Sequence, residues 1–463
     1  MSHTPVAAQS HPARSVPPVL PGALPVVGHA LRLLNNPAKF LTLAPAHGPL
    51  SRLRLGPLTA TLVSDPNLTR QVLLDDALFD KGGPLYDRIR DVMGNGLLSC
   101  PHTDHRPQRR LLQPAFHKDR LPAHLDLMAR EITDGVARWQ GRQVVDMAAQ
   151  AQALTARAIV ATLFDGTLDA ATVETMVEDM GAITAGINTH ALLPAAYTRL
   201  PLPAHRRYSR AQRHLRSTLG RIIAEHRSRT TDHGDFLTLL TQAGTERPAL
   251  SDREISDQVI TFFIAGMETT GNALAWAAHH LAQDAALQRQ VHAEAAALPP
   301  GLLSHTSLPH LELTGHVVTE SLRHYPPVWF LTRTVTRDTE LGGHPLRRGD
   351  TVVISAHLVQ HLPSAHPRPE TFDPGRWTSP QTEQPVPGSF IPFGLGARKC
   401  IGDSLGVGEL TLALAALTRR WHLEPASTAP VRFAKDIVIR PRNLHLRLRA
   451  HPGTPHTTPR PAD

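Results

Sequence analysis

The sequence has few cysteines and no long apolar run. Only two cysteines, Cys100 and Cys400, occur in 463 residues; this excludes a disulfide framework and is typical of a reducing compartment. No apolar run approaches the roughly 20 residues that a membrane-spanning helix needs, and residues 1–20 lack the apolar core of a signal peptide. We therefore expect a cytoplasmic protein without a membrane span.

Lysine is also scarce, so arginine supplies most of the positive charge. Lysine and arginine number 48 against 40 acidic residues. Such a surface can attract nucleic acid, an anionic membrane or an acidic protein. Because no basic block and no nucleic-acid recognition motif occurs, we expect no nucleic acid and favour an acidic partner protein. The densest cluster is Arg106, Arg109, Arg110, Lys118 and Arg120, which a solvated helix face would explain equally well.

The chain contains no convincing internal linker. Residues 1–20 and 451–463 are rich in proline and polar residues, which is typical of disordered tails. We expect a single domain over residues 21–450.

Periodicity predicts a mainly α-helical fold with small sheets at its margin. Residues 50–64 alternate apolar and polar on both sides of a Gly-Pro turn and predict a β-hairpin. Helical periodicity dominates from about 104 to 293. Short strand-like runs return at 331–337 and 351–354, and again within 431–448.

The most specific motif lies near the C-terminus. Residues 393–402 read Phe-Gly-Leu-Gly-Ala-Arg-Lys-Cys-Ile-Gly, a glycine-rich loop with a thiol just ahead of an apolar helix expected over 403–421. We expect Gly394, Gly396 and Gly402 to permit positive φ angles and the close approach of a planar group. A helix N-terminus favours the thiolate of Cys400.

A second motif interrupts a long helix. Ser251-Asp252-Arg253-Glu254 predicts a capping box that opens a helix of about 30 residues, or roughly 45 Å, ending near Ala282. Two glycines, two threonines and an acid occur together at its centre, over residues 265–271. A close helix–helix contact would explain the glycines, but several unfavourable choices together often mark a functional site.

Both motifs resemble those of the cytochrome P450 superfamily. The loop matches every fixed position of the family's haem-binding sequence Phe-x-x-Gly-x-Arg-x-Cys-x-Gly, and the helix centre matches its Gly-x-Asp/Glu-Thr motif. The resemblance implies a P450 fold in which haem b, iron protoporphyrin IX, lies between a long distal helix and a proximal cysteine loop. Cys400 would be the axial thiolate ligand of the iron.

The resemblance also implies roles for other residues. Thr269 and Glu268 would control proton delivery on the O2 side, and Gly266 would make room there. His105 stands where many relatives have tryptophan. The residues implied to contact haem are Cys400, Phe393, Arg398, Arg333, Arg109 and His105.

A third group of residues is structural in the family. Glu320 and Arg323 match Glu-x-x-Arg, and residues 369–376, which end at Arg376, match Pro-x-x-Phe-x-Pro-x-Arg. The resemblance implies a buried network of Glu320, Arg323 and Arg376 behind the haem. Replacing one member should leave an uncompensated buried charge.

The implied activity is insertion of one oxygen atom from O2 into a hydrophobic small molecule, with a ferredoxin- or flavodoxin-type electron donor and a monomeric enzyme. The implied substrate pocket includes Ala265, Val328 and Phe330. Residues 193–207 and 325–333 also resemble bacterial terpene-modifying members, so we expect a terpenoid of secondary metabolism. Fatty acids, steroids and polyketides remain alternatives.

Two other readings stay open. A haem-binding sensor or carrier without turnover would not need Glu268 and Thr269, and a peroxide-driven enzyme should lack that pair. The 28 histidines form no short zinc-binding motif, so we expect no metal besides haem iron.

Overall fold

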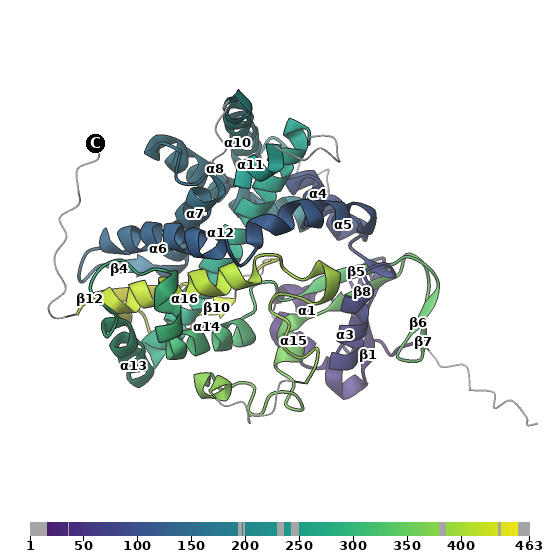
Figure 1. Cartoon of the computed structure of the whole chain (residues 1–463). Helices are drawn as coiled ribbons and strands as arrows, with labels where there is room; N and C mark the ends of the chain where they lie inside the picture. The colour runs from purple at the N-terminus through teal and green to yellow at the C-terminus, as the bar shows by residue number, and fades with distance from the viewer. Residues whose placement is uncertain are drawn as a thin grey trace, which may run out of the picture.

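The computed structural model describes residues 16–35, 37–192, 197, 200–228, 236–241, 250–378, 386–433 and 437–451. A helical part surrounds α12 (Asp252–Gln283), and a smaller part containing β1, β5 and β8 lies beside it (Figure 1). This is the mainly α-helical architecture that the periodicity predicts.

The described helices cover most of the expected helical region. Helix α12 begins with the predicted capping box, in which the Ser251 side chain accepts from the Glu254 N–H and the Glu254 carboxylate accepts from the Ser251 N–H. The helices are α1 (Ala30–Asn35), α2 (Pro37–Leu41), α3 (Pro66–Leu74), α4 (Gly83–Met93), α5 (His102–Leu112), α6 (Leu121–Ala137), α7 (Met147–Leu163), α8 (Ala170–Leu192), α10 (Pro203–Ser228), α11 (Phe236–Thr241), α12 (Asp252–Gln283), α13 (Ala285–Ala296), α14 (Glu312–His324), α15 (Ala356–Gln360) and α16 (Asp403–Arg420). The 3₁₀ turns are η1 (Ala44–His47), η2 (Gln113–Phe116), η3 (His305–His310), η4 (Pro374–Trp377) and η5 (Gly396–Arg398).

The largest sheet has the order β1-β2-β8-β5-β3. Its first two strands are the predicted hairpin, paired antiparallel from Leu50 opposite Val63 to Leu55 opposite Leu58. A second sheet has the order β4-β12-β9, and two hairpin-like pairs, β6-β7 and β10-β11, complete the set. The strands are β1 (Leu50–Leu55), β2 (Leu58–Val63), β3 (Phe79–Asp80), β4 (Val144–Asp146), β5 (Leu331–Val335), β6 (Thr339–Leu341), β7 (His344–Leu346), β8 (Thr351–Ile354), β9 (Trp421–Pro425), β10 (Arg432–Phe433), β11 (Pro441–Arg442) and β12 (His445–Ala450).

The expected N-terminal tail is too long. Leu20 is buried, and its N–H donates to the carbonyl of Arg52 while the Arg52 N–H donates to Pro18. These bonds add the segment before Leu20 to the edge of β1, so a disordered tail reaching residue 20 is wrong for residues 16–20. Residues 1–15 and 452–463 lie outside the described part.

The main hydrophobic core gathers around α12. Most of its length is buried, and the core includes side chains from α6, α7, α14 and α16. A helix that is apolar on most faces must be enclosed in this way. Within the described residues, every helix is too short or too polar to span a bilayer.

Candidate functional site

The loop that carries Cys400 is closed tightly on itself. The Cys400 N–H donates to the Phe393 carbonyl over 2.9 Å. Gly394 and Gly396 both have a φ of 70°, and a Cβ on Gly396 would lie 2.5 Å from the Leu73 carbonyl oxygen. Only glycine fits that position without strain. The expected positive φ of Gly402 is wrong, because this residue caps α16 with a φ of −101°.

The Cys400 thiol is accessible yet set in a recess of the protein. The residue is exposed, whereas burial among the surrounding atoms raises the pKa of its thiol above the ordinary value. The Gly402 N–H at the start of α16 and the charge of Arg109 act in the opposite direction. In the protein alone, burial therefore outweighs the helix terminus that predicts a thiolate. A metal at the sulfur would displace the proton.

Arg398 lies in an acidic cage. Its guanidinium donates to the Asp80 carboxylate and to the Cys100 carbonyl, both over 2.8 Å, and its Nε lies 3.4 Å from Asp76. Burial alone would raise the pKa of Asp76, but the hydrogen bond and charge of His102, together with Arg398, hold it below its ordinary value. Both carboxylates thus face a guanidinium that the sequence assigns to the cofactor.

Two more buried cations stand beside Arg398. Arg333 lies in β5, is 3 % exposed and makes a side-chain hydrogen bond with Tyr86. Lys81 donates to the Leu98 carbonyl over 2.9 Å. Burial, reinforced by the charges of Arg333 and Arg398, lowers the pKa of Lys81 to about 7. The three side chains would repel one another when all are charged, and an anion bound among them would lower the free energy of this arrangement.

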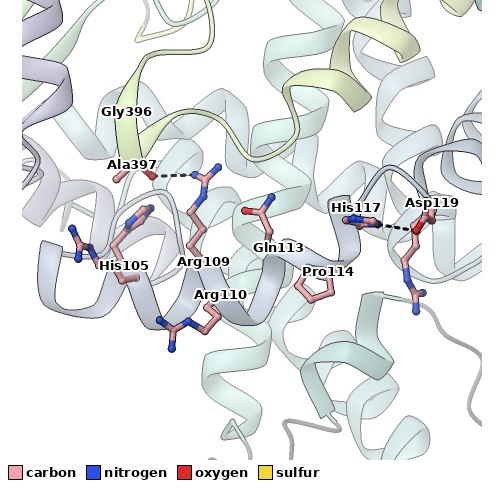
Figure 2. Close-up of a pocket in the computed structure, with 11 residues that line it drawn as sticks. His105, Arg109, Arg110, Gln113, Pro114, His117, Asp119, Gly396 and Ala397 are labelled. Carbon is pink, nitrogen blue, oxygen red and sulfur yellow. Dashed lines mark hydrogen bonds and ion pairs between the residues drawn. The ribbon is translucent and has the colours of Figure 1, made fainter.

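His105 and Arg109 come from successive turns of α5. His105 is buried, and its Nδ1 has no hydrogen-bond partner among the described residues. Burial and the charges of Arg398, Lys81 and Arg109 lower the pKa of His105 to about 3. Arg109 donates to the carbonyls of Ala397 and Lys399, over 3.2 and 2.6 Å, and so holds the cysteine loop from its outer side (Figure 2).

These side chains fit an anionic planar cofactor. Arg333 and Arg398 carry two positive charges and Lys81, with a pKa of about 7, can carry a third, whereas the carboxylates packed among them, Asp76 and Asp80, supply only two negative charges. The imbalance calls for further acceptor atoms, and the unpartnered His105 Nδ1 could donate to one of them in the tautomer that carries its proton there. The two carboxylates of haem would provide them, next to a thiol that can bind iron.

The centre of α12 is accessible on one face only. Between Ile255 and Ala278, every residue is buried except Ala265, Gly266 and Thr269. Positions i, i+1 and i+4 share a helix face, so this small surface points in one direction. The Thr269 hydroxyl donates to the Ala265 carbonyl over 2.5 Å, which leaves its oxygen lone pairs to accept a hydrogen bond.

The glycines of α12 serve packing. A Cβ on Gly266 would lie 2.9 Å from Cγ1 of Ile159, and one on Gly271 would lie 2.9 Å from Cα of Gln152, both on α7. An added side chain at Gly266 would therefore be directed toward α7, and the expectation that Gly266 makes room on the O2 side stays a prediction. The close helix contact is the alternative that the sequence left open.

The carboxylate of Glu320 on α14 accepts hydrogen bonds from several donors. Arg323 binds Glu320 through two bonds of 2.9 Å, and Arg376 donates to the same carboxylate over 3.1 Å. The Trp377 indole and the Asp373 N–H each add a bond of 3.0 Å. Glu320 and Arg323 are fully buried. The structure thus brings together the three residues that the sequence motifs associate, and ties η4 to α14.

The expected substrate segment lies beside the C-terminal part of the chain. Val328 forms a β-bridge with Val438, and the Ile439 N–H donates to the Pro327 carbonyl over 2.8 Å. Val328 and Phe330 are half-buried, as is Ala265. Residues 193–196 and 198–199, which belong to the other segment of terpene-modifying resemblance, lie outside the described part.

A hollow of about 820 Å³ opens on the outer side of α5 (Figure 2). Arg106, Arg109, Arg110 and Arg120 line it, and Asp119 is the single acid among the described residues of its wall. Gly396 and Ala397 of the cysteine loop form part of the same wall. The hollow is therefore strongly basic, and a molecule bound in it would contact the cysteine loop directly.

Lys81, Asp76 and Asp80 were not predicted from the sequence, because no short motif joins them to Cys400. Glu409 on α16 was not predicted either. Burial raises the pKa of Glu409 to about 8, against the lowering effect of a hydrogen bond from Thr270. This bond joins the helix after Cys400 to α12. A buried acid in an apolar helix is a signal that could have been noticed.

Comparison with known proteins gives one consistent result. The family model described as Cytochrome P450 matches residues 17–448. Pentalenene oxygenase of Streptomyces avermitilis is 39% identical over 437 residues, covering 94% of this chain and 97% of the relative. Cyclooctat-9-en-7-ol 5-monooxygenase of Streptomyces melanosporofaciens is 39% identical over 411 residues, covering 88% and 89%.

Solved structures agree with the fold. The crystal structure of the cytochrome P450DA heme domain superposes with a TM-score of 0.84 at 25% sequence identity, and the match covers 95% of this chain and 99% of that one. The mainly α-helical fold class expected from the sequence is confirmed.

Proposed function

Since this chain belongs to the cytochrome P450 family and is a haem-dependent monooxygenase, we propose that it inserts one oxygen atom from O2 into a terpenoid of secondary metabolism. Two terpenoid-modifying relatives at 39% identity over most of their length support the substrate class. The observation that carries the proposal is the small accessible face of α12, Ala265 and Thr269 included, in a helix that is otherwise enclosed.

The cofactor in this proposal is haem b. When bound, haem supplies an iron centre that activates O2 with electron density from a thiolate ligand. Cys400 provides that ligand. Arg333, Arg398 and Lys81 hold the haem carboxylates, and His105 Nδ1 gains the partner that it lacks. Phe393, whose carbonyl accepts the Cys400 N–H, would contact the haem from the same loop, and Arg109 fixes the loop by its bonds to two loop carbonyls.

Two residues of α12, Thr269 and Glu268, would deliver protons to the O2 side. Thr269 points its hydroxyl proton at the Ala265 carbonyl, so its oxygen can accept a hydrogen bond from the O2 side and later rotate to donate one. Glu268, 7 % exposed, is the adjacent acid that restores the proton. A positioned hydroxyl and carboxylate can deliver protons singly, which general acid catalysis requires. A haem sensor or carrier would not need this pair.

The substrate would be held by shape. Ala265, Val328 and Phe330 expose apolar surface, and apolar pockets bind through shape with few polar contacts. Both cysteines are free thiols, which suits a reducing compartment. We place the enzyme in the cytoplasm, as a monomer.

Electrons would enter through the basic hollow. An acidic ferredoxin- or flavodoxin-type protein is complementary to Arg106, Arg110 and Arg120, and opposite charge accelerates association. The hollow includes Gly396 and Ala397, so a donor seated there lies against the loop that carries Cys400.

A substrate screen tests the proposal. The haem-loaded protein is titrated with polycyclic terpenoids, fatty acids, steroids and polyketides, and the low-to-high-spin shift of the haem absorbance is recorded. We expect a saturable shift with terpenoids, followed by an oxygenated product when NADPH, a ferredoxin reductase and a ferredoxin are added. A shift with fatty acids and with no terpenoid would contradict the substrate class. Binding without any product would favour the sensor or carrier.

A further inference from the structure

Two histidines and a glutamate lie close together beside the Glu320 network. His324 is the last residue of α14, His361 directly follows α15, and Glu370 lies in the segment that leads to η4. One nitrogen of each histidine and one carboxylate oxygen of Glu370 lie within 4.8 Å of one another. This is the single such group of three or more metal-binding side chains within the described ranges.

Backbone carbonyls fix the tautomer of both imidazoles. His361 Nδ1 lies 2.8 Å from the His357 carbonyl, and His324 Nε2 lies 3.2 Å from the Glu370 carbonyl. A carbonyl only accepts, so these two nitrogens carry the protons, and His361 Nε2 and His324 Nδ1 carry lone pairs. Imidazoles that bind metals are commonly oriented by such a bond from the other ring nitrogen.

The His324 nitrogen that carries the lone pair is buried. This Nδ1 has no hydrogen-bond partner among the described residues, which costs free energy in a buried ring.

We infer that His324, His361 and Glu370 bind a divalent transition-metal ion of the zinc class, with water completing the coordination. Two imidazole nitrogens and one carboxylate oxygen are a donor set that zinc accepts. Glu370 is exposed, so the ion can enter from solvent. The sequence predicts no such site because the ligands come from three separate segments.

The ion would reinforce the Glu320 network. Arg323, adjacent to His324, donates to the Gln360 and Thr371 carbonyls, whose residues are the chain neighbours of His361 and Glu370. A metal ion bound by His324, His361 and Glu370 would therefore connect the same three chain segments that the hydrogen bonds of Arg323 connect. Binding should raise the thermal stability of the haem-loaded enzyme.

The test uses untagged, haem-loaded protein freed of metal by a chelator and titrated with zinc chloride by calorimetry. We expect one tight zinc per haem, with nitrogen and oxygen ligands at about 2.0–2.2 Å by X-ray absorption. Glu370→Gln and His361→Gln should each weaken binding by about tenfold or more. Haem absorbance and circular dichroism verify that each variant is folded.

Glu312→Gln is the matched control, since Glu312 is exposed at the other end of α14 and should keep wild-type affinity. Weak binding to other exposed histidines would be unchanged in all variants. Zinc binding that survives in Glu370→Gln, or a wild-type protein without a stoichiometric site, would overturn the inference.

Discussion

Single residues around Cys400 hold charges that the protein alone does not balance. Lys81, with its pKa lowered to about 7 by burial beside Arg333 and Arg398, is in an environment built for an anion. Burial likewise raises the pKa of the Cys400 thiol above its ordinary value. Both groups would change on cofactor binding: iron would replace the proton on the sulfur, with that proton released to solvent, and the haem carboxylates would stabilise the charged form of the lysine.

Thr269 provides a prediction at this scale. In Thr269→Ala the Ala265 carbonyl keeps its place, but the hydroxyl between it and the O2 side is gone. We expect haem content to be unchanged and the yield of product per electron to fall about tenfold or more, with hydrogen peroxide released instead. NADPH consumption, peroxide and product are measured together.

Thr269→Ser is the matched control, because it keeps the hydroxyl and should retain most of the coupling. Equal coupling in the alanine and serine variants, at the wild-type level, would remove Thr269 from proton delivery.

At the scale of elements, α12 is positioned by glycines and by polar bonds to its neighbours. Thr155 of α7 donates to the Met267 carbonyl over 2.9 Å, and Gly271 allows the two helices to approach. Thr270 bonds to Glu409 of α16. These contacts fix the position of α12 relative to both α7 and α16, the helix that follows Cys400.

Gly271→Ala gives a prediction about this contact. Alanine normally favours a helix by about 1 kcal/mol, but here its Cβ would lie 2.9 Å from the Gln152 backbone. Overpacking of this kind costs about 1–3 kcal/mol. We expect a lower midpoint of thermal unfolding for the haem-loaded protein.

Gly181→Ala is the control with the opposite sign. Gly181 lies in α8, and a Cβ there would meet nothing within 4 Å, so the same substitution should stabilise the protein. If both variants shifted the midpoint in the same direction, the α7–α12 contact would not be what Gly271 provides.

At the scale of the whole molecule, charge is distributed unevenly over the surface near the site. The hollow on α5 has four arginines and one acid, and it adjoins the cysteine loop. The wider excess of 48 basic over 40 acidic residues adds a long-range field of the same sign, which guides an acidic protein at low ionic strength.

We predict that replacing Arg106 and Arg110 by glutamine slows haem reduction by an acidic ferredoxin about tenfold at low salt. The difference should shrink as salt screens the charges. Stopped-flow reduction under carbon monoxide measures the rate. Arg206 and Arg210, exposed on α10, provide a control pair with the same loss of charge; equal slowing in both double variants would contradict docking at the hollow.

Sequence alone was enough to predict the cysteine loop, the capping box of α12, the hairpin over 50–64 and the residues of the Glu320 network. These depend on local patterns, such as glycine at a positive φ or an acid and a base on adjacent turns, that need no distant partner to be recognised. The direction of each side chain and the groups around it, by contrast, depend on how distant segments pack in the folded protein. This packing directs Gly266 toward α7, surrounds Arg398 with Asp76 and Asp80, places Lys81 beside them, and brings His324, His361 and Glu370 together. Burial and long-range charge set the pKa values of these groups, and both depend on atoms contributed by chain segments far apart in sequence.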